Sequence, residues 1–316
     1  MVVQITAMHE FCGRDILSFL KSLSLSSKMI KYLKYRNDGI RVNGNHVTVR
    51  YILKDGDLLQ LTLEDRSSSE TATPSPLPID IIYENDSIIV ANKPPFMPTH
   101  PSHGHHDDTL ANALAYYFEQ KALPFVFRPI NRLDRNTSGL VIVAKNKIAA
   151  AKMTDHMKNG RIKKSYIAIL NGRMPDPERT TAFEGMTLGI IDSPVRRTAK
   201  SIIVREVCHE EDEGAESALT YYRILARSDG YTKVEAFPQT GRTHQLRVHF
   251  ASLGFSIIGD DLYGTEDEFI ERHALHAHAL SFPSPSDPCV TIHLSAPIPN
   301  DMERAEHEHF KKQPIK

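Results

Sequence analysis

The spacing of apolar residues predicts two short helices near the start of the chain. Apolar side chains recur every three or four positions within 16–23 and again within 29–33, the period of an α-helix with one buried face. Ser26 or Ser27 can cap the second helix, because a serine hydroxyl accepts a hydrogen bond from a free backbone N–H. Both helices therefore begin and end within the first 65 residues.

Short apolar stretches follow these helices and predict a small sheet. Residues 40–42 run into an Asn-Gly pair at 43–44, a dipeptide that favours the tight turn of a β-hairpin. Residues 47–49 and 58–63 have the composition of further strands. We therefore expect residues 1–65 to form a small α+β domain.

A stretch rich in Ser, Thr and Pro at 66–78 has no apolar period and predicts an extended linker. Residues 79–316 then form the main domain, with a helix predicted at 110–118 and strands at 88–91, 139–144, 166–170, 222–226 and 232–237. Helix and strand signals do not alternate regularly. This favours an α+β fold with a mixed, largely antiparallel central sheet and flanking helices.

Composition and charge narrow the class of protein. The chain has 316 residues, 41% of them apolar, and a formal net charge of −1, as in an ordinary globular protein. Basic residues nevertheless gather in two segments, 28–50 and 121–174, where few acids accompany them. Such segments either form a face that binds a polyanion or simply solvate surface helices. The candidates for RNA contact in the first segment are Lys28, Lys31, Lys34 and Arg41.

The sequence does not indicate a membrane protein, a secreted protein, a disulfide-rich protein or a metal-binding protein. The apolar runs are too short to cross a bilayer, and the first residues lack the pattern of a secretion signal, so we expect a cytoplasmic protein without a membrane partner. The three cysteines are scattered, which excludes a disulfide framework or a cysteine zinc site. Histidines and acids also cluster, but without the usual metal-ligand spacing, so we expect a solvated loop and no metal at His103, His105, His106, Asp107 and Asp108.

The most informative stretch, residues 131–145, reads NRLDRNTSGLVIVAK. Asp134 lies between Arg132 and Arg135 in a polar loop that runs into an apolar strand, where a reactive group is both exposed and held. Neighbouring guanidinium groups favour the ionised carboxylate, the form that a nucleophile requires. A purely structural ion pair fits the same local pattern.

This stretch resembles the catalytic motif HRLDxxTSGLLxxAK of the RluA-type pseudouridine synthases. Further segments resemble other motifs of that family in the same order, from about residue 81 to residue 299, namely NKP at 92–94, KSYIA at 164–168, TGRTHQLRVH at 240–249, GDDLYG at 259–264 and LHA at 275–277. Residues 1–65 resemble the ribosomal-protein-S4-like RNA-binding domain. The chain departs from the catalytic motif at Asn131, where the family usually has histidine.

The resemblance implies an RNA pseudouridine synthase that works without a metal or an organic cofactor. Asp134 would be the essential carboxylate, either attacking the sugar or removing a sugar proton. Arg247 would pair with Asp134 and keep it ionised. Tyr166 would pack against the target base, and its hydroxyl could help remove the proton from carbon 5. Asn131 cannot titrate near neutral pH, which puts any acid–base role of that position in doubt.

The resemblance also implies a set of substrate-binding residues. Arg132 would fill the space left by a flipped uridine or grip its phosphate, and Arg242 and Lys93 would contact phosphates or support the cleft. A helix predicted over 246–253 would end at Gly254 and aim Arg247 into the cleft. Its buried residues would be Leu246, which also serves as a substrate contact, together with Phe250 and Leu253.

The identity of the RNA stays open in the sequence. The S4-like domain favours large-subunit ribosomal RNA, with transfer RNA as the alternative. A non-catalytic RNA-binding protein that acts in ribosome assembly is a competing hypothesis, but an intact set of Asp134, Tyr166 and Arg247 argues against it. A metal-dependent nuclease would need clustered carboxylates, whereas these motifs are rich in arginine. Nothing indicates an oligomer, so we expect a monomer.

Overall fold

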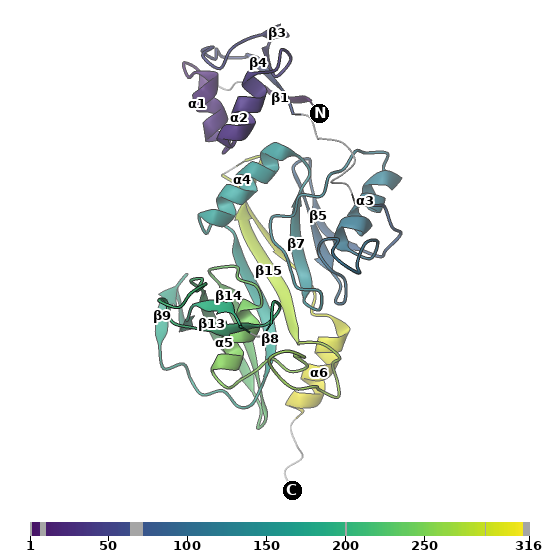
Figure 1. Cartoon of the computed structure of the whole chain (residues 1–316), viewed down its shortest axis with the longest axis vertical. Helices are drawn as coiled ribbons and strands as arrows, with labels where there is room; N and C mark the ends of the chain where they lie inside the picture. Colours follow the sequence, from purple (N-terminus) through teal and green to yellow (C-terminus); the bar gives the residue numbers. More distant parts are fainter. Residues whose placement is uncertain (1, 7–10, 64–71, 200, 288, 312–316) are drawn as a thin grey trace.

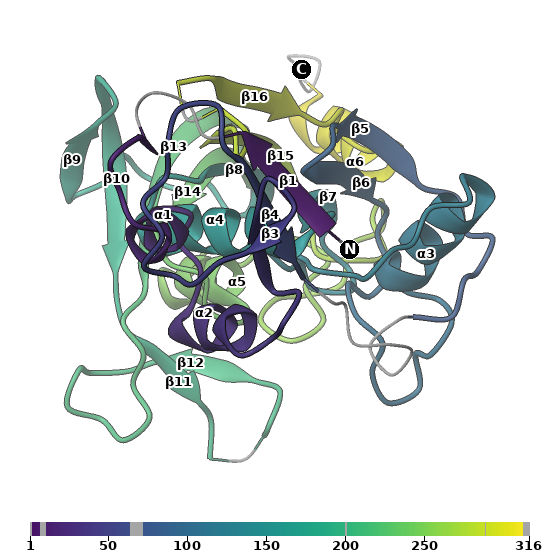
Figure 2. The same cartoon turned by 90° about the horizontal axis from the view of Figure 1, so that it is seen from above.

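The computed structural model describes residues 2–6, 11–63, 72–199, 201–287 and 289–311. It contains a small four-stranded sheet near the N-terminus and a ten-stranded sheet in the rest of the chain (Figure 1). A two-stranded hairpin, β11 (Val195–Arg197) with β12 (Arg205–Val207), projects beside the large sheet (Figure 2). The chain is thus α+β, with helices packed on a largely antiparallel sheet, as predicted. No helix of the described residues has the length and apolar character needed to cross a membrane.

The small sheet and two helices form an N-terminal module with its own apolar core. The strand order is β1-β4-β2-β3, all antiparallel. The module consists of β1 (Val2–Thr6), α1 (Ile16–Ser22), α2 (Ser27–Lys34), β2 (Ile40–Val42), β3 (Asn45–His46) and β4 (Leu58–Thr62). The β1 strand was not predicted.

Local signals in the module are mostly confirmed. The Ser26 hydroxyl accepts from the N–H of Met29 and caps α2, and the Asn-Gly pair makes the turn between β2 and β3 with positive φ angles. The strand predicted at 47–49 is wrong. There the carbonyl of Val49 accepts from the N–H of Leu17 at the start of α1, so the chain caps a helix instead of continuing the sheet.

The large sheet has the order β5-β6-β7-β15-β8-β14-β13-β10-β9, with β16 paired to β15. All neighbours are antiparallel except β7 and β15. Its strands are β5 (Asp80–Glu84), β6 (Ile88–Lys93), β7 (Ser138–Ala144), β8 (Lys163–Asn171), β9 (Thr180–Phe183), β10 (Met186–Asp192), β13 (Leu219–Arg227), β14 (Tyr231–Pro238), β15 (Leu275–Pro283) and β16 (Thr291–Ser295).

Helices cover both faces of the sheet around β6 and β7. Alternate residues of these strands belong to two separate core clusters, one with α4 (Lys147–Lys158) and one with α3 (Leu110–Gln120). Double burial explains why both strands read as continuous apolar runs in the sequence. Further along the sheet, α5 (Gln245–Ser252) and α6 (Asn300–Phe310) pack against β8, β13, β14 and β15.

The parallel pairing of β7 and β15 requires a glycine. Gly139 pairs with Ala277 at φ +114°, and a Cβ built on Gly139 would lie 2.3 Å from the carbonyl oxygen of Ala277. Any larger residue would therefore both strain the backbone and separate the strands. This close approach holds the loop that precedes β7 beside the loop that precedes β15.

The structure bears on two further predictions, the linker at 66–78 and the helix over 246–253. The predicted linker 66–78 lies outside the described residues up to position 71, and Thr73 and Ser75 hydrogen-bond to Asn112 of α3. The prediction that Leu253 is buried is wrong, because α5 ends at Ser252 and Leu253 is 42% exposed. Ile148 of α4 belongs to the module's core cluster, so the N-terminal module contacts the main domain at this helix.

Candidate active site

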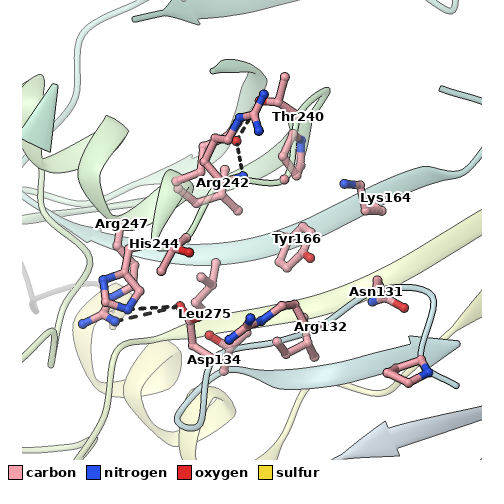
Figure 3. Close-up of a pocket in the computed structure, with 18 of the residues that line it drawn as sticks. Asn131, Arg132, Asp134, Lys164, Tyr166, Thr240, Arg242, His244, Arg247 and Leu275 are labelled. Atoms are coloured by element: carbon pink, nitrogen blue, oxygen red, sulfur yellow. Dashed lines mark hydrogen bonds and ion pairs between the residues drawn. The ribbon is translucent and has the colours of Figure 1, made fainter. Parts of the chain in front are cut away.

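A cavity of about 310 Å³ opens on one face of the large sheet, between β8, the loop 129–137 and the loop that leads into α5. Figure 3 shows Asp134 at one end of this cavity, with Arg247 and His244 beside it and Tyr166 across from it. Residues more than 100 positions apart meet here. The structure thus brings together the candidates Asp134, Tyr166, Arg132, Arg242, Leu246 and Arg247.

The loop that carries Asp134 is tied down at its start. The Asn131 side chain donates to the carbonyl of Leu140 at 3.1 Å and accepts from the N–H of Ile142 at 2.8 Å. The Thr99 hydroxyl exchanges hydrogen bonds with the backbone of Leu133. Asn131 therefore holds the loop against β7, a role that needs a donor and an acceptor and no titration.

Two buried cations hold the other end of the loop. Lys93 is fully buried, and its Nζ donates to the carbonyls of Pro94, Met97 and Arg135 at 2.8 to 3.1 Å. Burial, and then the charge of nearby Arg272, lower the pKa of Lys93 to about 7. A fully buried amine has no face free for RNA, so the suggestion that Lys93 contacts phosphate is corrected here in favour of cleft support.

Arg272 is the second buried cation, and the sequence analysis missed it. Its Nη1 donates to the carbonyl of Asn136 at 3.0 Å, two residues after Asp134. Its Nε and Nη2 bind both carboxylate oxygens of Asp301 at 2.7 and 3.0 Å. Because Asp301 lies in the first turn of α6, one guanidinium group connects this helix to the loop that carries Asp134.

Arg247 faces Asp134 but is held by a different acid. Its Nη1 lies 3.9 Å from Asp134 Oδ2, whereas its Nε and Nη2 make a two-pronged pair with Asp260 at 2.7 and 2.6 Å. Burial alone would raise the pKa of Asp260, but the hydrogen bonds and charge of Arg247 keep that pKa below its ordinary value. Nη2 also donates to Asp261 at 3.0 Å. Asp260 therefore fixes the guanidinium and leaves Nη1 directed at Asp134.

A chain of hydrogen bonds sets the proton of His244, which the sequence analysis placed in a motif without giving it a role. The backbone N–H of Arg205 donates to the Tyr263 hydroxyl at 2.8 Å, and this hydroxyl lies 2.9 Å from Nδ1 of His244. The hydroxyl already accepts from this N–H, so donating its own proton to Nδ1 completes its hydrogen bonds in the tautomer that carries the ring proton on Nε2. Nδ1 is then the acceptor, and Nε2 carries the ring proton 3.9 Å from Asp134 Oδ2.

His244 has an unusual backbone conformation and a lowered pKa. His244 has φ +58° at the N-terminus of α5, an uncommon conformation for a residue with a side chain. Burial lowers the pKa of His244, and the charge of Asp134 opposes that effect. The neutral ring is therefore the form that faces the carboxylate.

Tyr166 projects from β8 into the cavity (Figure 3). Burial, and then the negative charge of Asp134, raise the pKa of Tyr166. A phenol that keeps its proton more firmly than usual is a poor general base. This geometry favours packing against a base over the suggested removal of the carbon-5 proton.

The remaining candidates line the walls of the cavity. Leu246 is buried in the first turn of α5, and Arg132 is exposed at the opposite rim. Arg242 donates through Nε to the carbonyl of Ser217 and lies 3.7 Å from Glu216, with more than a third of its side chain exposed. Lys164, which the sequence analysis did not single out, lines the same cavity two residues before Tyr166.

One group of side chains has the spacing of metal ligands: Asp260, Asp261 and His273. Both oxygens of Asp260 accept from Arg247, and His273 Nε2 lies 2.8 Å from the Thr137 hydroxyl. These donors and acceptors already bind groups of the site, which favours a structural role for the cluster.

Comparisons with known proteins identify the class. Residues 87–252 match the family described as RNA pseudouridylate synthase. The chain is 35% identical to YjbO of Bacillus subtilis (strain 168), named an uncharacterized RNA pseudouridine synthase, over 89% of this chain and 94% of that protein. It is also 35% identical to the ribosomal large subunit pseudouridine synthase D of Borreliella burgdorferi, over 75% of this chain and 71% of that protein. The chain belongs to the RNA pseudouridine synthase family, among its RluA-type members.

A solved structure has the same fold. The human RNA pseudouridylate synthase domain containing 1 superposes with a TM-score of 0.55 at 28% identity, over 74% of this chain and 86% of that chain. The chain is therefore an RNA pseudouridine synthase, an isomerase that acts on uridine in RNA.

The lowered pKa of Lys93 leads to a pH-dependent prediction. The unfolded chain keeps the Lys93 proton up to about pH 10.5, whereas the folded protein releases it near pH 7, so stability rises with pH between these values. Replacing Lys93 with Met abolishes this gain. Urea titrations measure the free energy of unfolding of both proteins. The difference between the wild type and Lys93→Met should be about 1–2 kcal/mol larger, in favour of the wild type, at pH 9 than at pH 7. Lys158→Met changes an exposed residue of α4, so its free energy of unfolding should differ from that of the wild type by the same amount at every pH. The same constant difference for Lys93→Met would refute the prediction.

The hydrogen-bond chain to His244 leads to a kinetic prediction. Tyr263→Phe removes the proton donated to Nδ1 and frees the ring to exchange tautomers. We expect kcat for uridine isomerisation to fall about tenfold, the effect of one neutral hydrogen bond, with KM unchanged. The ¹⁵N shifts of His244 should report a protonated Nε2 in the wild type and a mixture in the variant. Tyr221→Phe is the control, and a variant with native kinetics would contradict this role of Tyr263.

Proposed function

We propose that the protein isomerises uridine to pseudouridine in large-subunit ribosomal RNA, with Asp134 as the essential carboxylate. The observation that carries this proposal is the position of Asp134 in the cavity. Its side chain is 27% exposed, and a guanidinium nitrogen of Arg247 and Nε2 of His244 each lie 3.9 Å from its Oδ2. These neighbours stabilise a negative charge and still leave the carboxylate open to a substrate.

The chemistry requires one carboxylate and no redox partner. The bond from C1′ of the sugar to N1 of uracil breaks, the base turns, and a new bond joins C1′ to C5. The proton on C5 is lost, and N1 gains a proton. Asp134 can assist as a nucleophile at C1′ or as a base that takes the C2′ proton, and both routes need it ionised.

The walls of the cavity support a flipped uridine. A uridine inside a stacked RNA helix cannot reach Asp134, so it must leave the stack. Tyr166 offers a ring face for the base, and Leu246 offers an apolar contact. Arg132 and Arg242 stand at the rim, where they can contact the phosphates of the displaced nucleotide.

The N-terminal module is the proposed second RNA contact. Lys28, Lys31 and Lys34 are all exposed on α2, and Arg41 is exposed on β2. Basic side chains on one surface position RNA through its phosphates, and RNA shape then selects the target loop. The module's resemblance to S4-like domains and the name of the Borreliella burgdorferi relative both favour large-subunit ribosomal RNA.

Asp134→Asn tests the proposed carboxylate. The assay is tritium release from RNA labelled at carbon 5 of uridine, purified from a strain that lacks this gene, with EDTA present. We expect release by the wild type, mainly from large-subunit ribosomal RNA, and a loss of more than about 1000-fold in Asp134→Asn. Asp261→Asn is the matched control, since it removes an exposed carboxylate that also contacts Arg247, and it should stay within about tenfold of the wild type.

The outcomes separate the competing functions. Release from transfer RNA alone would transfer the proposal to that substrate. RNA binding without release from any pool would support a non-catalytic RNA-binding protein. Loss of activity with EDTA would support metal-dependent chemistry.

Substitution of Lys28, Lys31 and Lys34 by Gln tests the module. Because these side chains lie far from the cavity, KM for ribosomal RNA should rise about tenfold while kcat stays unchanged. The slope of log affinity against log salt should become shallower by about two, near 0.7 for each lost phosphate contact. Lys311→Gln serves as the control, since it removes an exposed charge outside both basic segments, and an unaltered salt slope would remove the module from the RNA contact surface.

A further inference from the structure

A second cavity of about 390 Å³ adjoins the cavity with Asp134, which we call the catalytic cavity because of its proposed function. The two share Met157, Lys164 and Pro238 in their walls. It forms where β14 separates from β8, since their pairing ends at Ala236 and Tyr166 while β8 continues back to Lys163. The two cavities therefore lie on either side of one short stretch of β8.

Lys164 stands at the junction of the two cavities. It is partly buried and points away from β8 beyond Tyr166, at the end of the catalytic cavity opposite Asp134 (Figure 3). Its Nζ would lie 3.9 Å from a Cβ built on Gly241, so it approaches the loop before α5 closely. Within the described part of the chain, the Lys164 side chain makes no hydrogen bond or ion pair, although neighbouring Lys163 pairs with Glu184. A half-buried ammonium without an acidic partner suits a bound anion.

The wall of the second cavity suits a flat, polar-edged group. Phe237 is partly buried in it, and Phe183 stands beside Phe237 with ring centroids 6.4 Å apart. Two polar residues, Ser281 of β15 and Ser295 of β16, line the same cavity. An unstacked nucleobase combines an apolar face with hydrogen-bonding edges, and it stacks on aromatic rings whatever its identity.

Resting on the proposed function, we propose that the second cavity binds the base of a nucleotide next to the target uridine, with Lys164 holding the phosphate between the two. In this arrangement the shared wall lets two consecutive nucleotides occupy the two cavities. The negative charge of the phosphate complements the unpaired ammonium. Burial lowers the pKa of Lys164, so a phosphate that restores its charge would also stabilise the complex. The second cavity would then select RNA loops in which two adjacent bases are unstacked.

The test combines protein variants with modified RNA. The substrate is an RNA hairpin around the uridine mapped as this protein's target. One modification replaces the linkage on either side of that uridine with an uncharged methylphosphonate, and the other removes either neighbouring base. The protein variants are Lys164→Gln, Lys164→Arg and Phe237→Ala, with Lys311→Gln as the control at an exposed position just after α6.

We expect Lys164→Gln and Phe237→Ala each to raise KM about tenfold with kcat within twofold, and Lys164→Arg to restore most of the affinity. A methylphosphonate at one of the two linkages should raise the KM of the wild type but not that of Lys164→Gln. One abasic neighbour should weaken the wild type but not Phe237→Ala. These paired losses identify the phosphate and the base that occupy each site.

Independent losses, in which modified RNA weakens wild type and variant equally, would overturn the proposal. So would variants whose KM equals that of the control. An inactive wild type on every RNA pool would instead overturn the proposed function, which keeps the two failures distinct.

Discussion

The active site depends on the anchoring of one loop by buried cations. Lys93 and Arg272 bind backbone carbonyls at Arg135 and Asn136, immediately after Asp134. Backbone carbonyls accept strong hydrogen bonds from these groups, so the loop is fixed at the two residues that follow Asp134. The proposed role of Asp134 needs this rigidity, because small displacements of a reacting group greatly reduce reaction rates.

Around this loop, each group that faces Asp134 is held by a partner that does not. Asp260 fixes Arg247 through two hydrogen bonds, and Tyr263 fixes the proton of His244. Tyr263 in turn accepts from Arg205 of the projecting hairpin β11–β12. The preorganised donors cost no rearrangement when charge develops on the carboxylate or on the substrate. They also connect the surface hairpin to the catalytic centre through three consecutive polar contacts.

Sequence patterns predicted the elements that depend on neighbouring residues. The helices at 16–22 and 27–34, the Asn-Gly turn and the doubly buried strands all follow from local spacing, which the structure confirms. Errors occurred where distant contacts decide. Residues 47–49 have the composition of a strand, but they cap α1, and Leu253 has helical spacing, but α5 ends before it. Neither the hydrogen bond between Val49 and Leu17 nor the end of α5 could be seen from local composition.

The sequence by itself determined the family and the position of Asp134, because the motif is contiguous and its order along the chain is specific. Only the tertiary structure decided which groups surround that carboxylate. Lys93 became a buried support, Asp260 the partner of Arg247, and Arg272 a connection from α6 to the catalytic loop. The physical reason is that burial and pairing arise when strands distant in sequence meet, as β7 and β15 do at Gly139, and spacing along the chain carries no record of that meeting.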